Sequence, residues 1–251
     1  MNLLIIQARM GSSRLPGKVL KTIKGETLLA IQQKRIKGAK LVDRVVIATT
    51  TDPGDDAIER WCRENGTDVY RGSEQDVLDR YYQAAKPFAP QNVIRVTSDC
   101  PLHHRDVVDF AVSEFIKGGW DYFSNSNFEP QVLEDGFDTE VFTFAALEEA
   151  WRLADKRSER EHVTPYIKNS GRFRCGYRHF MAEYRYKLSV DTLNDFKAAE
   201  AIFGSFPTLD GFGMPEVVAL LEKRPELAQI NSDSVANAGY KKSLEQDNDK
   251  Q

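Results

Sequence analysis

The sequence predicts an α/β fold built on a mainly parallel sheet that is flanked by helices. Strand-sized apolar runs alternate with amphipathic helical segments through the first half of the chain, which is the pattern of successive βαβ units. The strands read as continuous apolar runs, as expected when both faces of a sheet are covered. Because ligands bind at the carboxyl ends of parallel strands, the loops after the first, third and fourth strands are the places to search for a site.

Four strands, with the helices that follow them, account for the first half of the chain. Each strand is a short apolar run, and each helix shows helical periodicity with a cap or a glycine at one end. The predicted strands are Leu3–Ala8, Val45–Thr49, Asp68–Tyr70 and Val93–Thr97. The predicted helices are Thr27–Ile36, Asp55–Asn65, Asp76–Lys86 and Arg105–Lys117, the last stopped by Gly118 and Gly119.

The pattern loosens after about Asp121. Two further strands are predicted, at Val141–Phe144 and Lys187–Val190. Four further helices are predicted, at Ala145–Asp155, Glu159–Lys168, Asp195–Phe203 and Pro215–Arg224. No linker rich in Pro, Gly or Ser divides the chain, so residues 1–242 are expected to form one domain, with residues 125–180 as its less regular part. Residues 243–251 are expected to be a frayed polar tail.

Composition and charge exclude several classes of protein. The 251 residues are 41% hydrophobic, which is enough for a core, and the longest apolar runs are too short to span a membrane. Residues 1–40 hold nine Lys and Arg against the single acid Glu26, although the whole chain has a net charge of −4. One basic end on an acidic body disfavours nucleic acid as a partner and fits a compact anionic ligand. Three widely spaced cysteines predict no disulfide framework or zinc site, and a cytoplasmic location.

The loop after the first strand, QARMGSSRLPGKVL at residues 7–20, carries more positive charge than a simple connection needs. Gly11 allows a ligand to approach the backbone closely, and the N–H groups of a tight loop form a concave anion site. Ser12 adds a hydroxyl donor, Arg14 can grip phosphate oxygens and Lys18 supplies a mobile charge. The glycine spacing fits neither a P-loop nor a G-x-G-x-x-G fingerprint. The loop therefore predicts a phosphate site of another kind, with Arg14 and Lys18 as its catalytic groups.

Two aspartates stand where a divalent cation is expected beside a phosphate. Asp99 follows the strand Val93–Thr97, at the sheet edge where the loop after the first strand also opens. Asp191 follows Lys187–Val190 and precedes a helix, a place where Asp also serves as an N-cap. Together the two carboxylates would hold Mg²⁺, which prefers carboxylate, water and phosphate oxygens. Asp195 is interpreted as a structural acid.

Six separated motifs resemble one family. In chain order they are QARMGSSRLPGKVL, YRGSEQDVLDRYYQAA, RVTSDCPL, GFDTEVF, EREHVTPYI and VDTLNDF. They are similar to the CMP-sugar-acid cytidylyltransferases, and most closely to the branch of the spore coat polysaccharide biosynthesis proteins. The resemblance extends to about residue 230. It implies a Rossmann-like nucleotidyltransferase fold, CTP as the donor, Mg²⁺ as the cofactor, pyrophosphate as the leaving group and a homodimer joined through residues 125–180.

The residues that the resemblance places against CTP lie in loops at the carboxyl edge of the predicted sheet. The phosphates would lie on Arg9, Arg14 and Lys18. The other nucleotide contacts are expected at Ala8, Met10, Gly11, Ser12, Arg71, Gly72, Ser73 and Asp99. Recognition of the base is left open among Arg71, Ser73, Asp76 and Arg80, because related enzymes differ in this segment. Asp99 and Asp191 would bind the metal.

The acceptor is expected to be a small anion, such as a sugar acid, a phosphate or a phosphonate. Asp138 and Glu140 lie two apart on a predicted strand and so share a face, which either binds acceptor hydroxyl or amino groups or forms a solvated sheet edge. Arg160 and His162 would overhang the sheet and help to hold an acidic acceptor, although a lone histidine is also commonly structural.

Two other functions are compatible with parts of the sequence. A nucleotide-sugar-dependent glycosyltransferase would share a similar sheet, but no D-x-D motif follows a strand and the basic loop suits a triphosphate better. A nucleotide-binding protein without catalysis is the second alternative, and the intact set of Arg14, Lys18, Asp99 and Asp191 weighs against it. The sequence therefore predicts an enzyme that transfers CMP to an anionic acceptor.

Overall fold

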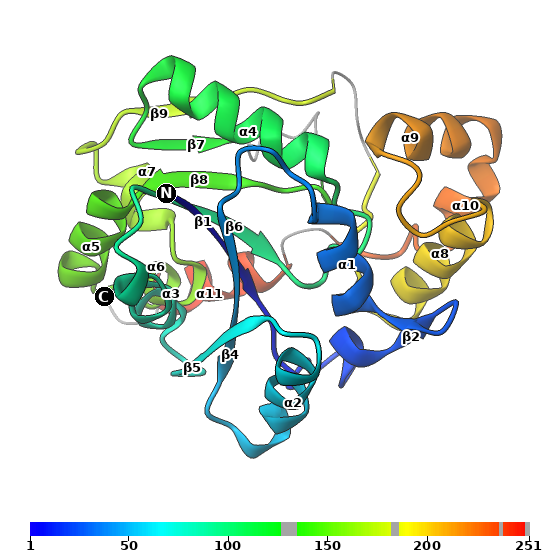
Figure 1. Cartoon of the computed structure of the whole chain (residues 1–251), viewed down its shortest axis with the longest axis horizontal. Helices are drawn as coiled ribbons and strands as arrows, with labels where there is room; N and C mark the ends of the chain where they lie inside the picture. Colours follow the sequence, from blue (N-terminus) through cyan, green and yellow to red (C-terminus); the bar gives the residue numbers. More distant parts are fainter. Residues whose placement is uncertain (127–134, 182–185, 236–237, 249–251) are drawn as a thin grey trace.

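A computed structural model of the chain describes residues 1–126, 135–181, 186–235 and 238–248. The strands of its main sheet are β1 (Asn2–Gln7), β4 (Arg44–Thr50), β5 (Asp68–Gly72), β6 (Asn92–Thr97), β7 (Tyr122–Ser124), β8 (Glu140–Thr143) and β9 (Cys175–Tyr177). They lie in the order β5-β4-β1-β6-β8-β7-β9 (Figure 1). Strand β8 is antiparallel to both of its neighbours, and the other neighbouring strands are parallel. The mainly parallel sheet predicted from the sequence is confirmed.

Helices cover both faces of the sheet. Successive residues of a strand point to opposite sides, so a strand of consecutive apolar residues needs cover on both. Leu3 and Ile5 of β1 pack on the face covered by α3 (Val77–Ala85), α5 (Phe144–Leu153) and α7 (Pro165–Asn169). Leu4 and Ile6 pack on the other face, under α1 (Leu28–Ile36), α2 (Asp56–Glu64) and α4 (Arg105–Gly118). All four side chains are fully buried, and burial of each contributes about 2 kcal/mol.

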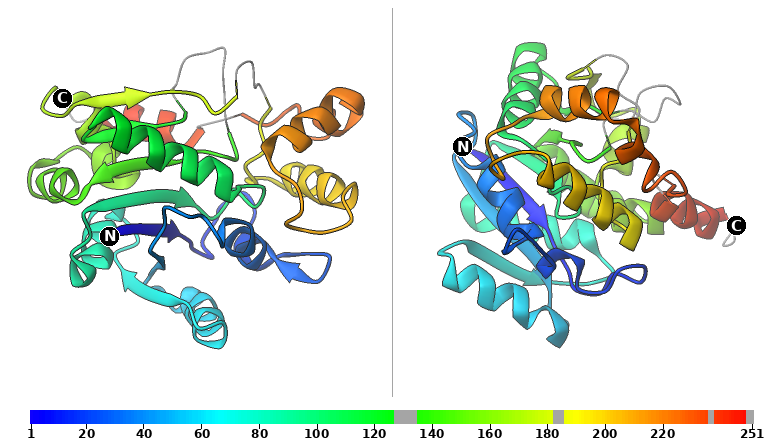
Figure 2. Two further views of the ribbon diagram at one scale, coloured as in Figure 1. Left: turned by 45° about the horizontal axis from the view of Figure 1, so that its top comes forward. Right: turned by 90° about the vertical axis from the view of Figure 1, so that its right-hand side faces the viewer.

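Three helices from the C-terminal third pack beside α1 at one end of the molecule. They are α8 (Leu193–Gly204), α9 (Met214–Lys223) and α10 (Pro225–Gln229), and Figures 1 and 2 show them on the side opposite to α5 and α7. They share an apolar cluster with Leu28 and Ile31 of α1. Arg35, also on α1, is fully buried and donates hydrogen bonds to the carbonyl oxygens of Leu102, His103, Leu209 and Phe212. One side chain thus ties these helices to the loop after β6.

Several short elements were not predicted. Besides β7, β9 and α10, they are the hairpin of β2 (Thr22–Ile23) and β3 (Glu26–Thr27), and the 3₁₀ turns η1 (Lys18–Leu20), η2 (Pro53–Asp55) and η3 (Lys86–Phe88). Elements of two to five residues carry too few side chains to show a period in the sequence. No helix among the described residues is both long and apolar enough to cross a membrane.

The helix predicted at Glu159–Lys168 is instead two short helices, α6 (Arg157–His162) and α7. Val163 lies between them with a φ of 70°, a value outside the helical region, and Pro165 begins α7. A proline lacks the N–H group that would continue the hydrogen bonding of the preceding helix. The chain therefore turns at Val163, and α6 is oriented separately from α7.

The strand predicted at Lys187–Val190 is wrong, because these residues belong to no sheet. Their backbone groups bond to loops instead. The N–H of Val190 donates to the carbonyl oxygen of Asp99 at 2.7 Å. The N–H groups of Leu188 and Ser189 donate to Asp135 Oδ1 at 3.1 and 2.7 Å. Residues 188–190 are buried, as those of a strand would be, but they lie beside Asp99 at the end of the sheet.

The expectation of a frayed tail is wrong for residues 243–248, which lie in α11 (Ala238–Asn248). Ser243 is buried, and its hydroxyl donates to Glu161 Oε2 of α6 at 3.0 Å. The N–H of Ser158 donates to Asp247 Oδ1 at 3.1 Å. Contacts with α6 therefore order this polar segment. Residues 249–251, and the part of the segment 125–180 between 127 and 134, lie outside the described residues.

Candidate active site

The candidate site lies at the carboxyl edge of the sheet, between the loops that follow β1 and β6. The chain order reverses at this point, since β4 and β5 lie on one side of β1 and β6 lies on the other. Loops that diverge at such a reversal leave room for a ligand between them. The N–H of Ser98 donates to the carbonyl oxygen of Gln7 at 3.1 Å and joins the bases of the two loops.

The loop after β1 is folded back on itself by its own backbone. The carbonyl oxygen of Met10 accepts hydrogen bonds from the N–H groups of Ser12 and Gly17, both at 2.9 Å. Gly17 has a φ of 67°, a left-handed conformation that favours glycine, and directly precedes η1. A Cβ at this position would lie 3.2 Å from Met10 Cε. This turn starts η1 at Lys18, whose side chain crosses to the loop after β6.

Asp55 anchors the same loop from the side of β4, and its role was not predicted. Its Oδ1 accepts the N–H of Met10 at 2.6 Å, and its Oδ2 accepts the N–H and the hydroxyl of Thr50. Asp55 is buried. The only signal in the sequence is the acidic turn TTTDPGDD at residues 49–56, which ends a parallel strand. Such a turn indicates a capping acid but does not identify a partner 45 residues away.

Lys18 joins the two predicted metal-binding carboxylates. Its Nζ lies 3.2 Å from Asp99 Oδ2 and 3.0 Å from Asp191 Oδ1, and it donates a 2.7 Å hydrogen bond to the carbonyl oxygen of Val190. Lys18 is only 9% exposed. The structure thus brings together one residue of the loop after β1, one of the loop after β6 and one from the amino end of α8.

Mutual attraction keeps these groups charged. Burial lowers the pKa of Lys18, but the charges of Asp99 and Asp191 outweigh burial and raise it. Burial raises the pKa of Asp99, but the charge of Lys18 and a hydrogen bond from Thr97 outweigh burial and lower the pKa to about 2. Lys18 and Asp99 are therefore both charged at neutral pH.

Two further cations contact Asp191. Arg14 Nη2 lies 3.1 Å from Asp191 Oδ1, and the Arg14 side chain is 43% exposed. Lys187, which was expected only as the first residue of a strand, places its Nζ 3.3 Å from Asp191 Oδ2 and 3.0 Å from Asp195 Oδ2. Asp195 also accepts the N–H of Thr192 at 2.8 Å in the capping box of α8. Its interpretation as a structural acid is confirmed.

The turn after β5 faces the loop after β1. Arg9 Nη1 lies 3.0 Å from Glu74 Oε1, and both side chains are about half exposed. A Cβ on Gly11 would lie 3.6 Å from the same Glu74 oxygen. The guanidinium group of Arg71 is turned to α2 instead, where its donors meet the carbonyl oxygens of Thr50 and Asp52 and the carboxylates of Asp56 and Glu59.

The other predicted nucleotide contacts shape the backbone of these two loops. The N–H of Ala8 donates to the carbonyl oxygen of Ala48 at 3.1 Å and so extends the pairing of β1 with β4. The hydroxyl groups of Ser12 and Ser73 accept the N–H groups of Leu15 and Asp76, at 3.3 and 3.0 Å. At Gly72 a Cβ would come within 2.8 Å of Tyr70 Cε1. The side chains of Ser12 and Ser73 thus hold the turns in which they lie.

Arg80 lies beneath the turn after β5 and is 2% exposed. Its Nη1 donates to the carbonyl oxygen of Ser73 at 2.8 Å, whereas its Nε has no hydrogen-bond partner among the described residues. Gln7 Oε1, at the end of β1, is buried and likewise lacks a partner among them. Burial lowers the pKa of Arg80. An unpaired buried polar atom costs about 1–3 kcal/mol, and a ligand that supplied a partner would offset part of that cost.

Asp138 and Glu140, predicted as an acceptor-binding pair, have different surroundings. Glu140 is buried in β8, with its carboxylate bound by Arg95, Tyr122, Thr164 and Lys168. Asp138 precedes β8 and accepts the N–H of Gly136 at 3.1 Å. Burial and the charge of Asp135 raise the pKa of Asp138 to about 7. Burial raises the pKa of Cys100, and the charges of Asp99 and Asp138 raise it further, so Asp138 lies near this cysteine.

Arg160 and His162 hold α6 in place. Arg160 Nε donates to both carboxylate oxygens of Asp76 at 3.0 Å, and its Nη1 donates to the carbonyl oxygen of Trp151 at 2.7 Å. His162 Nε2 lies 3.0 Å from Ser243 Oγ of α11. Burial lowers the pKa of His162 to about 4, so the imidazole is neutral at pH 7 and offers an acidic acceptor no charge.

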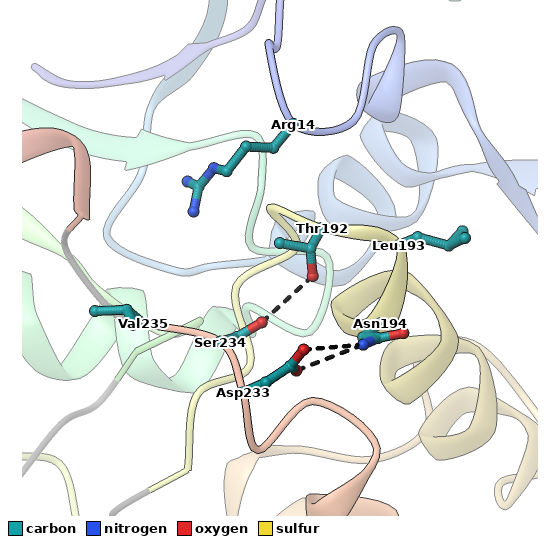
Figure 3. Close-up of a pocket in the computed structure, with 7 residues that line it drawn as sticks. All are labelled: Arg14, Thr192, Leu193, Asn194, Asp233, Ser234 and Val235. Carbon is teal, nitrogen blue, oxygen red and sulfur yellow. Dashed lines mark hydrogen bonds between the residues drawn. The ribbon is translucent and has the colours of Figure 1, made fainter.

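A cavity of about 450 Å³ opens beside Arg14 and the amino end of α8 (Figure 3). Its lining residues are Arg14, Thr192, Leu193, Asn194, Asp233, Ser234 and Val235. Figure 3 shows the Arg14 side chain extending from the loop after β1 toward this space, with Thr192 and Ser234 joined across it at 3.3 Å. Because Arg14 also bonds to Asp191, the cavity adjoins the Lys18 cluster. Residues 233–235 were not predicted, since no motif marks them.

The oxygens around Lys18 suit a hard divalent cation. Asp99 and Asp191 offer carboxylate oxygens, and Val190 offers a carbonyl oxygen, around the position of one ammonium nitrogen. In the described part of the chain, no three His, Cys, Asp or Glu side chains form a group that would hold a metal by themselves. Mg²⁺ commonly takes one or two carboxylates and completes its shell with water and phosphate oxygens. The residues therefore fit an ion that binds together with a nucleotide.

Comparisons with known proteins match most of the chain. A family model described as cytidylyltransferase matches residues 3–232. The chain is 38% identical over 232 residues to an uncharacterised protein of Methanocaldococcus jannaschii, covering 91% of this chain and 93% of that one. It is 31% identical over 238 residues to a spore coat polysaccharide biosynthesis protein of Bacillus subtilis, covering 90% and 96%. A solved cytidylyltransferase from Leptospira borgpetersenii matches with a TM-score of 0.84 and 30% identity, covering 94% and 99%.

Proposed function

The chain belongs to the cytidylyltransferase family of CTP-dependent enzymes, and from this premise we propose that it transfers CMP from CTP to a sugar acid or a related small anion. We propose that pyrophosphate is released and that Mg²⁺ is required. The observation that carries the proposal is the convergence of Lys18, Asp99 and Asp191 at the carboxyl edge of the sheet. Similarity to a spore coat polysaccharide biosynthesis protein supports a place in the synthesis of a surface polysaccharide or glycoconjugate.

In the proposed complex, the cytosine base lies between the loop after β1 and the turn after β5. Cytosine presents its amino group as a donor, and its carbonyl oxygen O2 and ring nitrogen N3 as acceptors. Gln7 Oε1 is a buried acceptor and Arg80 Nε a buried donor, and each lacks a partner among the described residues. The base would pair with both, and Arg9 and the Gly11 backbone would lie over the ribose and phosphates.

The triphosphate would lie along the loop after β1. Lys18 would leave its bonds with Asp99 and Asp191 and turn to a phosphate oxygen, and Arg14 would bind the β and γ phosphates on the side of the cavity in Figure 3. Asp99 and Asp191 would hold Mg²⁺, which neutralises charge on the phosphates when it is bound. The two acids thus exchange one cation for another, and their own charge is never left unpaired.

The proposed reaction is a displacement at the α-phosphorus of CTP. An acceptor oxygen forms a bond to that phosphorus, and the bond to the bridging oxygen breaks with its electron pair on the departing pyrophosphate. A hydroxyl acceptor would also lose its proton to water, whereas a phosphate or phosphonate oxygen carries none. Catalysis of such transfers comes mainly from alignment and from neutralising charge on the leaving group, the roles proposed for Lys18 and Arg14. The contacts of Glu140, Arg160 and His162 support structural roles for them, which leaves Asp138 as the acceptor-side candidate of the four. The homodimer stays a prediction.

A pyrophosphate-release screen tests the proposal. Each nucleoside triphosphate is combined with Mg²⁺ and with a panel of keto sugar acids, phosphates and phosphonates. We expect release with CTP, and with at least one acceptor of the panel. Asp99→Asn, which keeps the shape of the side chain, should lose metal-dependent release while its circular dichroism spectrum stays that of the parent. Metal-dependent release that survives in Asp99→Asn would contradict the proposed site.

A further inference from the structure

The two carboxylate oxygens of Asp191 have different partners. Oδ1 faces the site, where it meets Lys18 Nζ at 3.0 Å and Arg14 Nη2 at 3.1 Å. Oδ2 meets Lys187 Nζ at 3.3 Å. A carboxylate bound through both oxygens cannot rotate freely about its Cβ–Cγ bond without losing an ion pair. The direction in which Oδ1 points is therefore set in part by Lys187.

Lys187 is itself held firmly. Its side chain is 9% exposed, and its Nζ donates to the carbonyl oxygen of Ser189 at 2.6 Å besides its ion pairs with Asp191 and Asp195. Asn231 Nδ2 donates to the carbonyl oxygen of Lys187 at 3.0 Å and to Asp195 Oδ1 at 2.7 Å. An ammonium group with three protein acceptors has its donors occupied. Lys187 is thus placed to orient other groups, and a role in contacting substrate is not needed to explain it.

We propose that Lys187 is a positioning residue for the carboxylate that holds the divalent cation. The proposal rests on the proposed function, because it assigns Asp191 to the metal. Carboxylates that bind metals are commonly oriented by a hydrogen-bond donor on their far side, and loss of that donor weakens metal binding 10- to 100-fold. Lys187 also remains beside Asp191 when Lys18 turns to a phosphate, so this acid keeps one cation on its far side.

Metal affinity of the full-length protein separates this role from a purely structural one. Mn²⁺ serves as the probe, and its binding in the presence of CTP is measured by electron paramagnetic resonance. Lys187→Met keeps the length of the side chain and removes its charge, and we expect the Kd for Mn²⁺ to rise about 10-fold or more. Lys187→Arg keeps a charged donor and should restore most of the affinity. Lys34→Met, which removes an exposed partner of Glu26, is the matched control and should bind Mn²⁺ like the parent.

Activity and stability complete the test. We expect kcat/KM for pyrophosphate release to fall in Lys187→Met, while the Kd for CTP measured without metal changes less than about threefold, because the nucleotide-binding loops are untouched. A folded Lys187→Met with parental Mn²⁺ affinity and only a lower Tm would overturn the proposal. Should Lys187→Met not fold, Lys187→Gln gives the same comparison, with the same two outcomes. A parent enzyme that binds no Mn²⁺ with CTP and releases no pyrophosphate would instead contradict the proposed function.

Discussion

Lys18 and Asp99 are 81 residues apart in the chain, yet the ammonium nitrogen of one lies 3.2 Å from a carboxylate oxygen of the other. The contact joins the loop after β1 to the loop after β6, between which the order of the strands reverses. The same nitrogen also contacts Asp191, which lies 173 residues after Lys18 in the chain. Three distant segments are thus linked through one amine, and substitutions around it test both chemistry and structure.

Lys18→Ala should depress turnover with CTP by about 100-fold or more, the usual effect of removing a group that neutralises charge in the transition state. The free energy of unfolding should fall by only about 1–3 kcal/mol, because Arg14 and Lys187 still face Asp191. Initial rates of pyrophosphate release and urea unfolding measure the two effects. Lys34→Ala is the control, and parental turnover in Lys18→Ala would remove Lys18 from the mechanism.

Arg80→Met should weaken CTP binding without a matching loss of stability. The guanidinium group is buried with an unpaired Nε, so its removal relieves a desolvation cost while it loses one hydrogen bond to Ser73. We expect KM for CTP to rise about 10-fold and the free energy of unfolding to change by less than about 1 kcal/mol. Steady-state kinetics with CTP and UTP should also show reduced discrimination between them. A large loss of stability with an unchanged KM would assign Arg80 to the core.

His162→Gln should flatten the pH dependence of stability. The pKa of His162 is about 4 in the folded protein against the ordinary 6.5, so the unfolded chain binds more protons between these values. Stability from the neutral imidazole is therefore present above pH 6.5 and lost as the pH falls toward 4. Between pH 7 and 5 the parent should lose about 1–2 kcal/mol more than His162→Gln in urea unfolding.

Buried His103 has a pKa of about 3 and titrates over the same range, but it is present in both proteins and cancels in the difference. Turnover with CTP at pH 7 should be the same in both proteins, because His162 Nε2 contacts Ser243 of α11. A selective rise in KM for the acceptor in His162→Gln would instead assign this histidine a role in binding the acceptor.

Arg35→Met should cost about 3–5 kcal/mol of stability, because several buried carbonyl oxygens lose their donor at once. The acceptors belong to the loop after β6 and to the segment before α9, so the loss falls on the packing of the C-terminal helices. Urea unfolding measures the effect. Lys34→Met changes the neighbouring residue of α1 and should stay within about 0.5 kcal/mol of the parent, since Lys34 is exposed.

The strands and the place of the site were predictable because each depends on local pattern. The run Leu3–Ala8 agrees with β1 to within one residue at each end, and the loops after β1 and β6 meet as the carboxyl-edge rule requires. The density of positive charge then singled out the loop that holds Lys18, and the position of Asp99 directly after a parallel strand singled out that acid. Local sequence pattern was therefore sufficient to predict that the loops after β1 and β6 meet at the site.

The remaining contacts depend on partners that no local pattern names. Lys187–Val190 resembles a strand in composition, but Asp135 and the Asp99 carbonyl satisfy its backbone, and both lie far away in the chain. His162 resembles a ligand for an acid, yet Ser243, its partner, lies 81 residues later. Periodicity in the sequence shows which face of an element is buried, but it does not show which side chains of other elements that face will contact.

The order in which the parts of the site appear along the chain has a consequence for biosynthesis. Among the described residues the last strand of the sheet ends at Tyr177, whereas Lys187, Asp191 and the supporting Asn231 all follow it. During translation the strands of the sheet leave the ribosome before these three residues do, and domains begin to fold from the N-terminal side. A nascent or truncated chain of 180 residues would carry Lys18 and Asp99 but not Asp191. Chains that end before residue 191 would therefore lack the second acid, and the pair could form only after Asp191 had been added.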